Sequence, residues 1–344
     1  MKSLKYNTII IGAGLAGCNM ALNLHAKGEK VLLIGHPNGD RCSSVAAGLM
    51  NPIVPKGVAS TWKRDEIFSQ ILPYYQNLQR LLKTEVLQQI NIHQLMSNVS
   101  MRNEWQKSCE KTENKAVVEE LEDGVFEIKP VYRLDVSLFL ESTKRYFNER
   151  NAYVERDLNH ADIRCDKVIE YAEYSSDKLL FCEGHELINN PFFNYLPLSH
   201  SSGLIGEYSL DHTFSPAHII RRKKWCIPTK NGTYLVGSTF VNNDFSVCPT
   251  AREQNEIEED LSNWTKSFQR KELKKGLRPI VGDRRPLLGK HHKHNNLFVY
   301  NGLGSKGCSL SAVFCPMLTE HMMNNGILLP DVDIKRFKYT DYTA

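Results

Sequence analysis

The sequence lacks several features that would mark a specialised class of protein. It contains no internal repeat and no low-complexity tract, and its composition is that of an ordinary enzyme. The formal net charge is only +4, from 43 basic and 39 acidic residues. Charge alone therefore indicates no nucleic-acid partner, and we expect no membrane partner. A length of 344 residues allows two domains, each with its own hydrophobic core.

The cysteines lack the spacing of a disulfide framework or of a zinc site. There are nine of them, an odd number, and no two form a Cys-x-x-Cys pair. This pattern favours a reducing compartment, so we expect a cytoplasmic protein without a bound metal. The run KHHKH at 290–294 contains metal-ligand side chains, but its position between apolar stretches predicts an exposed loop.

A glycine motif near the N-terminus predicts a dinucleotide-binding turn. Gly12, Gly14 and Gly17 form the pattern Gly-x-Gly-x-x-Gly. The apolar run Ile9–Ile11 precedes them and is suited to a buried parallel strand. Gly12 permits a tight turn, Gly14 lets the backbone approach a pyrophosphate, and Gly17 lets the next helix pack close to the sheet. The free amides and positive dipole end of that helix would bind the phosphates.

The second strand of this unit lacks the acidic residue that usually ends it. Val31–Ile34 form the predicted strand, and Gly35 stands where Asp or Glu would bind the adenosine ribose. NAD is held mainly through this one unit, so the loss would matter for NAD. FAD is held along its length by several segments, so the gap favours FAD. His36, Asp40 or a bridging water could substitute for the acid.

Two further segments have the composition that a flavin site needs. The run RCSSVAAGLMNP at 41–52 places small and hydroxylated residues around Gly48, where a flat ring can approach the backbone. Near the other end, Leu297–Tyr300 predict a strand, and three glycines at 302–307 predict a turn before a helix from about Ser309. The N-terminus of that helix would stabilise negative charge on a reduced flavin.

These segments resemble the D-amino-acid-oxidase superfamily of FAD-dependent amine oxidases. RCSSVAAGLMNP is similar to the flavin loop of glycine oxidase. The segment at 297–322 is especially close to the oxidase half of the bifunctional bacterial enzyme that matures wobble uridines in tRNA. GLRPIVGDRRPLLG at 276–289 resembles the family's glycine–leucine–arginine–proline motif. Two further matches are WCIPTKNGTYLVGSTF at 225–240 and DKLLFCEGHE at 177–186, which keeps Gly184 but places Glu183 and His185 beside it.

The resemblance implies an α/β protein with a Rossmann-type FAD-binding domain assembled from separated segments. These segments would be 1–90, 131–190 and 276–344. A smaller α+β substrate domain, with a mixed or antiparallel sheet and helices, would be inserted as 91–130 and 191–275. The resemblance does not extend to most of 61–130, and it leaves the oligomeric state open.

The resemblance also implies that FAD is bound noncovalently. The cysteine motif that attaches flavin covalently in sarcosine oxidases has no match here. The residues expected to bind FAD come from the turns described above: Gly12, Gly14, Leu15, Ala16, Gly17, Cys42, Ser43, Ser44, Ala47, Gly48, Leu49, Gly184, Gly302, Leu303, Gly304, Ser305, Lys306 and Gly307.

Two residues are expected to contact the substrate. In resembling oxidases the arginine at the position of Arg278 binds the substrate carboxylate through its bidentate guanidinium; the alternative is a structural ion pair with Asp283. Trp225 would shape the substrate pocket, or else belong to the core. Lys306 could favour the anionic reduced flavin, or be an exposed loop lysine.

We therefore expect an FAD-dependent oxidoreductase that transfers hydride from a small carboxylated amine to flavin, with oxygen as acceptor. Glycine, sarcosine and D-amino acids are substrates of this type. A neutral amine assists hydride departure, so the absence of an obvious catalytic triad is no objection. One alternative is oxidative removal of a carboxymethyl group from a tRNA wobble uridine, which the low net charge argues against. Another is a non-catalytic flavin-binding protein, suggested by Gly35 and by the altered turn at 182–186.

Overall fold

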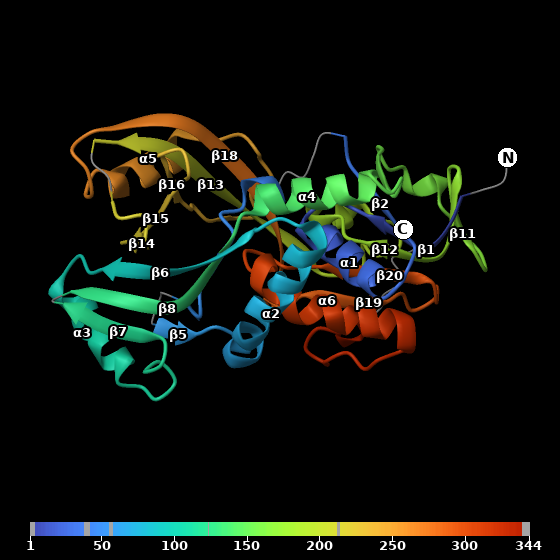
Figure 1. The fold of residues 1–344 in the computed structure, drawn as a ribbon, viewed down its shortest axis with the longest axis horizontal. Coiled ribbons are helices and arrows are strands. Elements are labelled where there is room, and N and C mark those ends of the chain that lie inside the picture. The colour runs from blue at the N-terminus through green and yellow to red at the C-terminus, as the bar shows by residue number, and fades with distance from the viewer. Residues whose placement is uncertain (1–3, 38–41, 55–57, 123, 212–213, 339–344) are drawn as a thin grey trace.

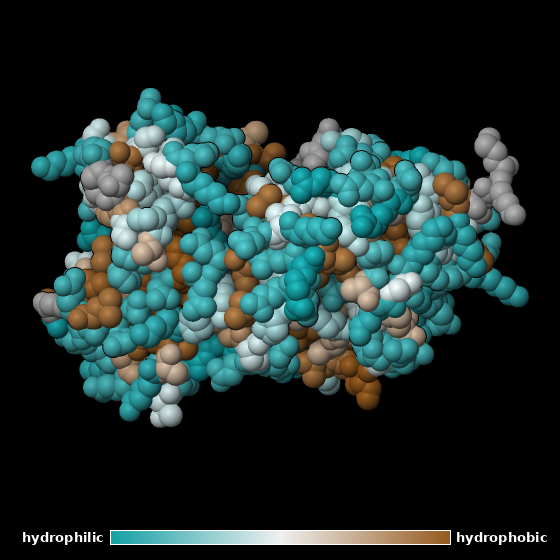
Figure 2. Space-filling view, viewed as in Figure 1, coloured by the Kyte–Doolittle hydropathy of each residue, from teal (hydrophilic) through white to brown (hydrophobic). Residues whose placement is uncertain are grey.

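Two large β-sheets form the two ends of an elongated molecule (Figure 1). The computed structural model describes residues 4–37, 42–54, 58–122, 124–211 and 214–338. The first sheet and its helices lie on the right of the view, and the second sheet lies on the left. The predicted α/β fold is confirmed. On the face seen in Figure 2 the surface is largely hydrophilic, with apolar side chains in small separate groups.

The first sheet has a parallel centre in the order β12–β1–β2–β9, which β20 extends by pairing with β12. Its central strands are buried on both faces, and their sequences are therefore continuous apolar runs. Ile9 and Ile10, for example, are fully buried. The strands are β1 (Leu4–Ile11), β2 (Val31–Gly35), β9 (Tyr153–Glu155), β10 (Arg164–Cys165), β11 (Ile169–Tyr171), β12 (Tyr174–Phe181), β19 (Leu287–Lys290) and β20 (Leu297–Asn301).

Three helices lie side by side against this sheet: α1 (Leu15–Ala26), α4 (Val136–Asn148) and α6 (Gly307–Asn324) (Figure 1). A fourth helix, α2 (Arg64–Leu82), packs on α6. Gly28 caps the C-terminal end of α1, since its φ of 87° is left-handed and its amide donates to the His25 carbonyl. Within the described residues, no helix combines the length and the apolar character needed to cross a membrane.

The second sheet is built around a long antiparallel pair, β13 with β18. Two helices, α3 (Val99–Cys109) and α5 (Ala251–Leu261), belong to this end of the molecule. The ten strands are β3 (Leu49–Met50), β6 (Leu87–Leu95), β7 (Val118–Glu122), β8 (Val125–Leu134), β13 (Leu198–Leu210), β14 (His218–Arg221), β15 (Trp225–Pro228), β16 (Tyr234–Gly237), β17 (Val241–Asn242) and β18 (Phe268–Val281).

Short elements complete the chain. A two-stranded sheet pairs β4 (Ile53–Val54) with β5 (Ala59–Ser60). The 3-10 turns are η1 (Ser43–Val45), η3 (His160–Asp162), η4 (Gly184–Asn189) and η5 (Ile334–Arg336).

The bounds of the strands can be compared with the domain limits expected from the sequence. Three of those limits, 90/91, 130/131 and 275/276, fall inside β6, β8 and β18. The division into two domains stays a prediction, and we propose that its limits follow the ends of these strands, because cutting a strand would break a continuous hydrogen-bonded ladder.

The histidine-rich run after β19 differs from its prediction. His291 is only 5% exposed, and its ring packs edge-on against Phe193 with the ring centres 5.3 Å apart. Burial, together with the neighbouring His292 and His294, lowers the pKa of His291 to about 4. The expectation of an exposed loop is therefore wrong for this residue. Among the described residues, no three His, Cys, Asp or Glu side chains are grouped to hold a metal ion.

Candidate active site

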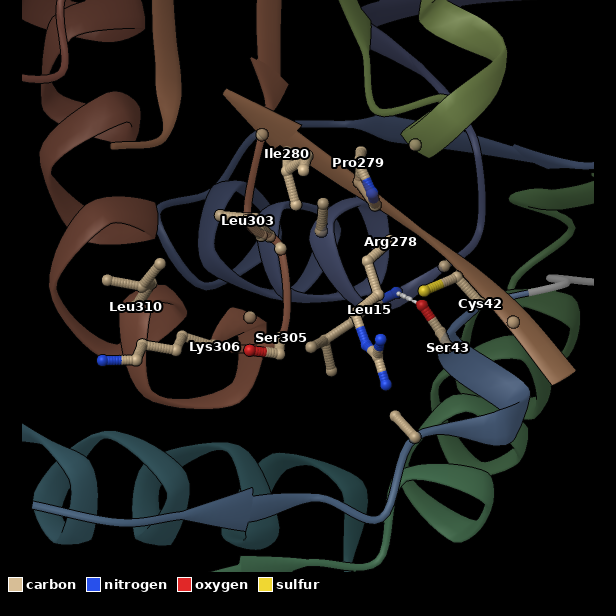
Figure 3. A pocket seen from close by; sticks show the side chains of 18 of the residues that line it. Leu15, Cys42, Ser43, Arg278, Pro279, Ile280, Leu303, Ser305, Lys306 and Leu310 are labelled. Carbon is tan, nitrogen blue, oxygen red and sulfur yellow. Dashed lines mark hydrogen bonds between the residues drawn. The ribbon is translucent and has the colours of Figure 1, made fainter. Parts of the chain in front are cut away.

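A cavity of about 1320 Å³ is lined by residues from both sheets. Sites for drug-sized ligands are roughly 300–1,000 Å³, so this cavity has room for a dinucleotide and a small substrate together. Its walls include the β1–α1 turn, the 42–54 segment, the ends of β2 and β12, strand β18 and the turn before α6 (Figure 3). The segments predicted to bind FAD therefore meet in one place.

All but two of the residues predicted to bind FAD line this cavity, and the exceptions are Gly17 and Ser44. Gly17 lies beneath the turn, where an added Cβ would overlap the carbonyl oxygen of Gly12. Its role is to let α1 approach the turn. At Gly12, with φ of 101°, an added Cβ would also overlap a backbone atom, the Cys182 carbonyl oxygen. The contact of the other residues with FAD stays a prediction.

The β1–α1 turn fits the pyrophosphate of a dinucleotide. Helix α1 has no acidic residue in its first turn, so the positive end of its dipole has no competing charge. The Leu15 amide donates to Ser43 Oγ at 3.0 Å, which joins the 42–54 segment to this helix (Figure 3). At Gly48 an added Cβ would overlap the Leu134 carbonyl oxygen, so only glycine allows this segment to lie against β8. The residues present therefore suit FAD.

The space beside Gly35 is already filled. An added Cβ at this position would lie 2.7 Å from the Tyr153 hydroxyl oxygen and 3.1 Å from Ala13 Cβ. Tyr153 comes from β9, which pairs in parallel with β2. His36, which the sequence offered as a substitute, lines the cavity and lies 3.3 Å from the Asp157 carboxylate. Asp40, the other candidate, lies outside the described residues.

The altered turn after β12 has a structural explanation. The Glu183 side chain is 6% exposed, and its carboxylate accepts from Asn190 Nδ2 at 2.6 Å. It also lies 2.7 Å from His160 Nε2. Asn190 in turn accepts from the Phe192 and Phe193 amides. Glu183 therefore organises the segment after the turn, and its presence does not by itself argue against catalysis.

Arg278 projects from β18 into the cavity (Figure 3). Its guanidinium donates to the Ser202 carbonyl at 2.9 Å, to Ser238 Oγ at 3.1 Å and to the Thr239 carbonyl at 3.3 Å. Gly203 leaves the room that the guanidinium occupies, because an added Cβ there would overlap it. Burial lowers the pKa of Arg278 from its ordinary value.

The predicted alternative, an ion pair between Arg278 and Asp283, is wrong. Asp283 pairs with Arg336 at 2.9 Å because the 283–285 turn directs its carboxylate toward η5. In the described part of the chain, no carboxylate lies within ion-pair distance of Arg278. Its charge is therefore held by neutral oxygen atoms and left without an anion.

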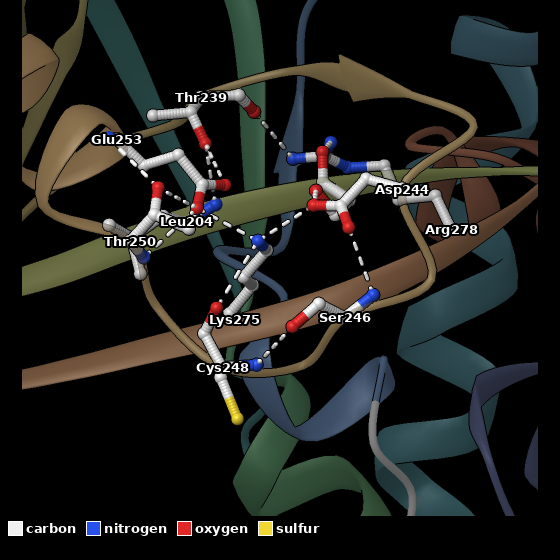
Figure 4. A network of polar contacts seen from close by, with 10 residues as sticks. Leu204, Thr239, Asp244, Ser246, Cys248, Thr250, Glu253, Lys275 and Arg278 are labelled. Atoms are coloured by element: carbon white, nitrogen blue, oxygen red, sulfur yellow. Dashed lines mark hydrogen bonds and ion pairs between the residues drawn. The ribbon is translucent and has the colours of Figure 1, made fainter.

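A buried ion-pair network holds the loop that supplies these oxygen atoms (Figure 4). The Lys275 side chain is fully buried, and its Nζ lies 2.7 Å from Asp244 and 2.8 Å from Glu253. Asp244 accepts from Ser202 Oγ at 2.7 Å, and Glu253 forms a capping box with Thr250 at the start of α5. The network thus ties the 238–253 segment to β13 and β18, on either side of the Arg278 guanidinium.

Trp225 and Lys306 both line the cavity. Trp225 is partly buried in β15 and also packs against the apolar core of the second sheet, so the pocket and core interpretations are compatible. Lys306 precedes α6, whose first turn contains no acidic residue. Its side chain is solvent-exposed, in agreement with the alternative of an exposed loop lysine, but it also lines the cavity. Partial desolvation by the surrounding protein, followed by the charges of Arg285 and Arg284, lowers the pKa of Lys306.

Lys306 lies at the positive end of the cavity, which also contains two arginines that were not predicted as site residues. Arg284 and Arg285 line it, although they were read only as part of a motif. The Arg285 guanidinium lies 4.2 Å from the ring centre of Trp62, and Trp62 stacks on Phe314. Two adjacent arginines, separated by four residues from the Arg278–Pro279 pair, were the available signal. Trp62 lies in the stretch where the resemblance ended.

The sequence has two short basic runs, RRKKW at 221–225 and KELKKGLR at 271–278, and several of their side chains have partners within the chain. Arg221 donates to Gln94 at 2.7 Å, and Lys224 pairs with Glu256. Lys275 is the buried centre of the network described above. These side chains are not displayed as a surface for nucleic acid.

Comparisons with known proteins agree with this architecture. The model of a family described as FAD dependent oxidoreductase (DAO) matches residues 7–321. The iminodiacetate oxidase of Chelativorans sp. BNC1 is similar in structure, with 18% identity, a TM-score of 0.75, and coverage of 96% of this chain and 98% of that one. The glycine oxidase of Geobacillus kaustophilus has 15% identity, a TM-score of 0.74, and coverage of 99% and 100%. The L-proline dehydrogenase of P. horikoshii has 12% identity, a TM-score of 0.78, and coverage of 97% and 98%.

Replacing Lys275 by Met is expected to lower the free energy of unfolding by about 3–5 kcal/mol, because the buried Glu253 carboxylate would lose its partner. Chemical denaturation followed by circular dichroism measures the change. The matched control is Lys274→Met, at an exposed position that pairs with Glu272 and where a small effect is expected. Equal effects of the two substitutions would contradict the role of the network.

The contribution of Asp244 to stability is expected to depend on pH. Hydrogen bonds from Lys275 and then from Ser202 lower its pKa to about 2. Because an unfolded aspartate has a pKa of about 3.9, the contribution is present above about pH 4 and is lost as the pH falls toward about 2. Urea denaturation of the wild type and Asp244→Asn should therefore show a stability difference at about pH 6 that disappears toward about pH 2. A difference that persists at the lower pH would refute this.

Proposed function

Because this chain belongs to the family of FAD-dependent oxidoreductases matched above, we propose that it oxidises a small carboxylated amine of the glycine, sarcosine or D-amino acid type. We further propose that FAD is held noncovalently, that oxygen is the electron acceptor, and that the protein acts in the cytoplasm. Two of the structural neighbours are a glycine oxidase and an iminodiacetate oxidase, which supports a substrate of this chemical class.

The observation that carries the proposal is the unneutralised charge of Arg278. A guanidinium has five N–H donors, and three bonds to neutral oxygens leave two for a ligand. They are Nε–H and one Nη1–H, which lie on different edges of the guanidinium, and each can donate a charge-assisted hydrogen bond to a carboxylate. Since a partly buried cation without a counter-charge is costly, binding a carboxylate at this point would also stabilise the site.

The roles of the chain's own residues follow from this contact. FAD, when bound, supplies the acceptor for the hydride that leaves the carbon beside the nitrogen. Arg278, fixed by the Ser202 and Thr239 carbonyls, would hold the substrate carboxylate and so orient that carbon. Trp225 and Phe240 line the same cavity and would exclude water from the reacting carbon. No side chain has to act as a strong base if the amine reacts in its neutral form.

The basic residues at the positive end of the cavity narrow the proposed substrate class. Arg284, Arg285 and Lys306 line the cavity, and among the described residues no carboxylate pairs with any of them. Arg285 is held over the Trp62 ring, which reduces the entropy lost when it binds a ligand. These cations favour an amine with a second acidic group over one with a single carboxylate.

The direct test of the proposal is the visible spectrum of the holoprotein, recorded without oxygen after adding glycine, sarcosine and D-amino acids. Loss of the flavin absorbance with one of them is the expected result. A holoprotein whose flavin none of these amines reduces would overturn the proposed substrate class. It would direct the next assay to modified tRNA, or to a binding role without turnover.

Replacing Arg278 by Gln is expected to lower kcat/KM for the amine on the order of 10- to 100-fold, the loss of a charge-assisted pair of hydrogen bonds. The FAD content of the variant, read from its absorbance, should stay near that of the wild type. Arg270→Gln is the matched control, since Arg270 lies on the same strand but is exposed and pairs with Glu258. If both variants behave alike, Arg278 does not bind the substrate.

Two matched pairs of amines test the second acidic group: sarcosine with iminodiacetate, and D-alanine with D-aspartate. The members of each pair differ only by a carboxylate. The dicarboxylated member is expected to have the higher kcat/KM, by about tenfold, and Arg285→Gln should reduce that preference by weakening an ion-assisted contact. Steady-state oxygen consumption measures both. A preference for the monocarboxylated members would exclude this refinement.

A further inference from the structure

The end of β2 raises the question of what binds the adenosine ribose. A dinucleotide on a Rossmann-type turn directs its ribose to the carboxyl end of the second strand, where a carboxylate accepts hydrogen bonds from the hydroxyls. Gly35 stands at that place, and the Tyr153 hydroxyl fills the space that its side chain would need. Tyr153 itself is occupied, because its hydroxyl donates to Glu155 at 2.8 Å. The carboxylate must therefore come from elsewhere in the chain.

Among the described residues, three carboxylates line the cavity: Asp157, Glu183 and Glu186. Glu183 is buried and holds His160 and Asn190. Glu186 belongs to η4, where it accepts from Asn189 and lies 3.0 Å from His185. Both carboxylates therefore already have partners near β12.

Asp157 differs from Glu183 and Glu186 in its position and its exposure. β9 runs parallel to β2, and Gly35 is opposite Glu155, so Asp157 follows β9 at the same edge of the sheet. Its side chain is 85% exposed, and its carboxylate lies 3.3 Å from His36 Nε2. His36, directly after Gly35, also lines the cavity. The two side chains therefore join the ends of β2 and β9 where the ribose is expected.

We propose that Asp157 accepts the hydrogen bonds of the FAD adenosine ribose, with His36 beside it, in place of the acid that is absent at position 35. The carboxylate is supplied by the neighbouring strand, because Tyr153 of that strand blocks the usual position. The same negative charge disfavours a phosphorylated ribose, as in NADP. This assignment concerns the cofactor alone and does not depend on which amine is oxidised.

The test compares FAD with FMN, which has no adenosine. Apoprotein of the wild type and of Asp157→Asn is titrated with each flavin, and binding is followed by the change in flavin fluorescence. We expect Asp157→Asn to raise the Kd for FAD at least tenfold, the loss of one or two charge-assisted hydrogen bonds, and to leave the Kd for FMN unchanged. Asp177→Asn is the matched control, since Asp177 is an exposed aspartate of β12 that pairs with Lys5 away from the cavity.

Two outcomes would overturn the assignment. One is a parallel loss of FAD and FMN affinity in Asp157→Asn, which would indicate a general disturbance of the cavity. The other is an unchanged Kd for FAD in Asp157→Asn together with a loss in Asp40→Asn. If FMN binds too weakly to titrate, ADP and 2′,3′-dideoxy-ADP are compared as competitors of FAD. The wild type should then prefer ADP, and Asp157→Asn should not.

Discussion

The cavity depends on backbone segments that approach one another more closely than any side chain would allow. At Gly12 the turn after β1 lies against the Cys182 carbonyl, and at Gly48 the 42–54 segment lies against the Leu134 carbonyl. The first contact holds the nucleotide turn between parallel strands of the first sheet. The second joins that turn to the second sheet through β3 and β8. Because a Cβ would overlap a carbonyl oxygen at either place, only glycine allows these two close contacts beside the cavity.

Charge is distributed unevenly along this cavity. Asp157, Glu183 and Glu186 line it near the ends of β9 and β12, whereas Arg278, Arg284, Arg285 and Lys306 line it near β18 and the start of α6. In the part of the chain that the structure describes, no carboxylate pairs with these four cations, since Asp283 pairs with Arg336 and Asp244 pairs with Lys275. The long β13–β18 pair and the buried Lys275 network fix the Arg278 guanidinium within this end. Positive charge at one end of the cavity suits an anionic substrate there.

Several differences between expectation and structure have one physical origin. Asp283 does not pair with Arg278, because a turn directs its carboxylate toward Arg336 of η5, about fifty residues further along the chain. The expected domain limits cut β6, β8 and β18 because their partners in the sheet are distant in sequence. His291 is buried because Phe193 and Tyr195, far from it in sequence, pack against it. In each case a long-range contact decided what neighbouring residues could not.

The sequence by itself determined the βα nucleotide turn, the final strand–turn–helix unit and Arg278 as a candidate for the substrate carboxylate. The first two are encoded locally, in glycine spacing and in short apolar runs, whereas the role of Arg278 is implied by the resemblance of its motif to the oxidase family. The tertiary structure alone decided that these segments share one cavity, that Arg278 has no carboxylate partner among the described residues, and that Tyr153 occupies the space beside Gly35. It also brought Asp157 to the end of β2, 122 residues after Gly35, because the parallel register of β2 and β9 aligns their ends. Register and packing depend on pairs of residues distant in sequence, and no local pattern specifies them.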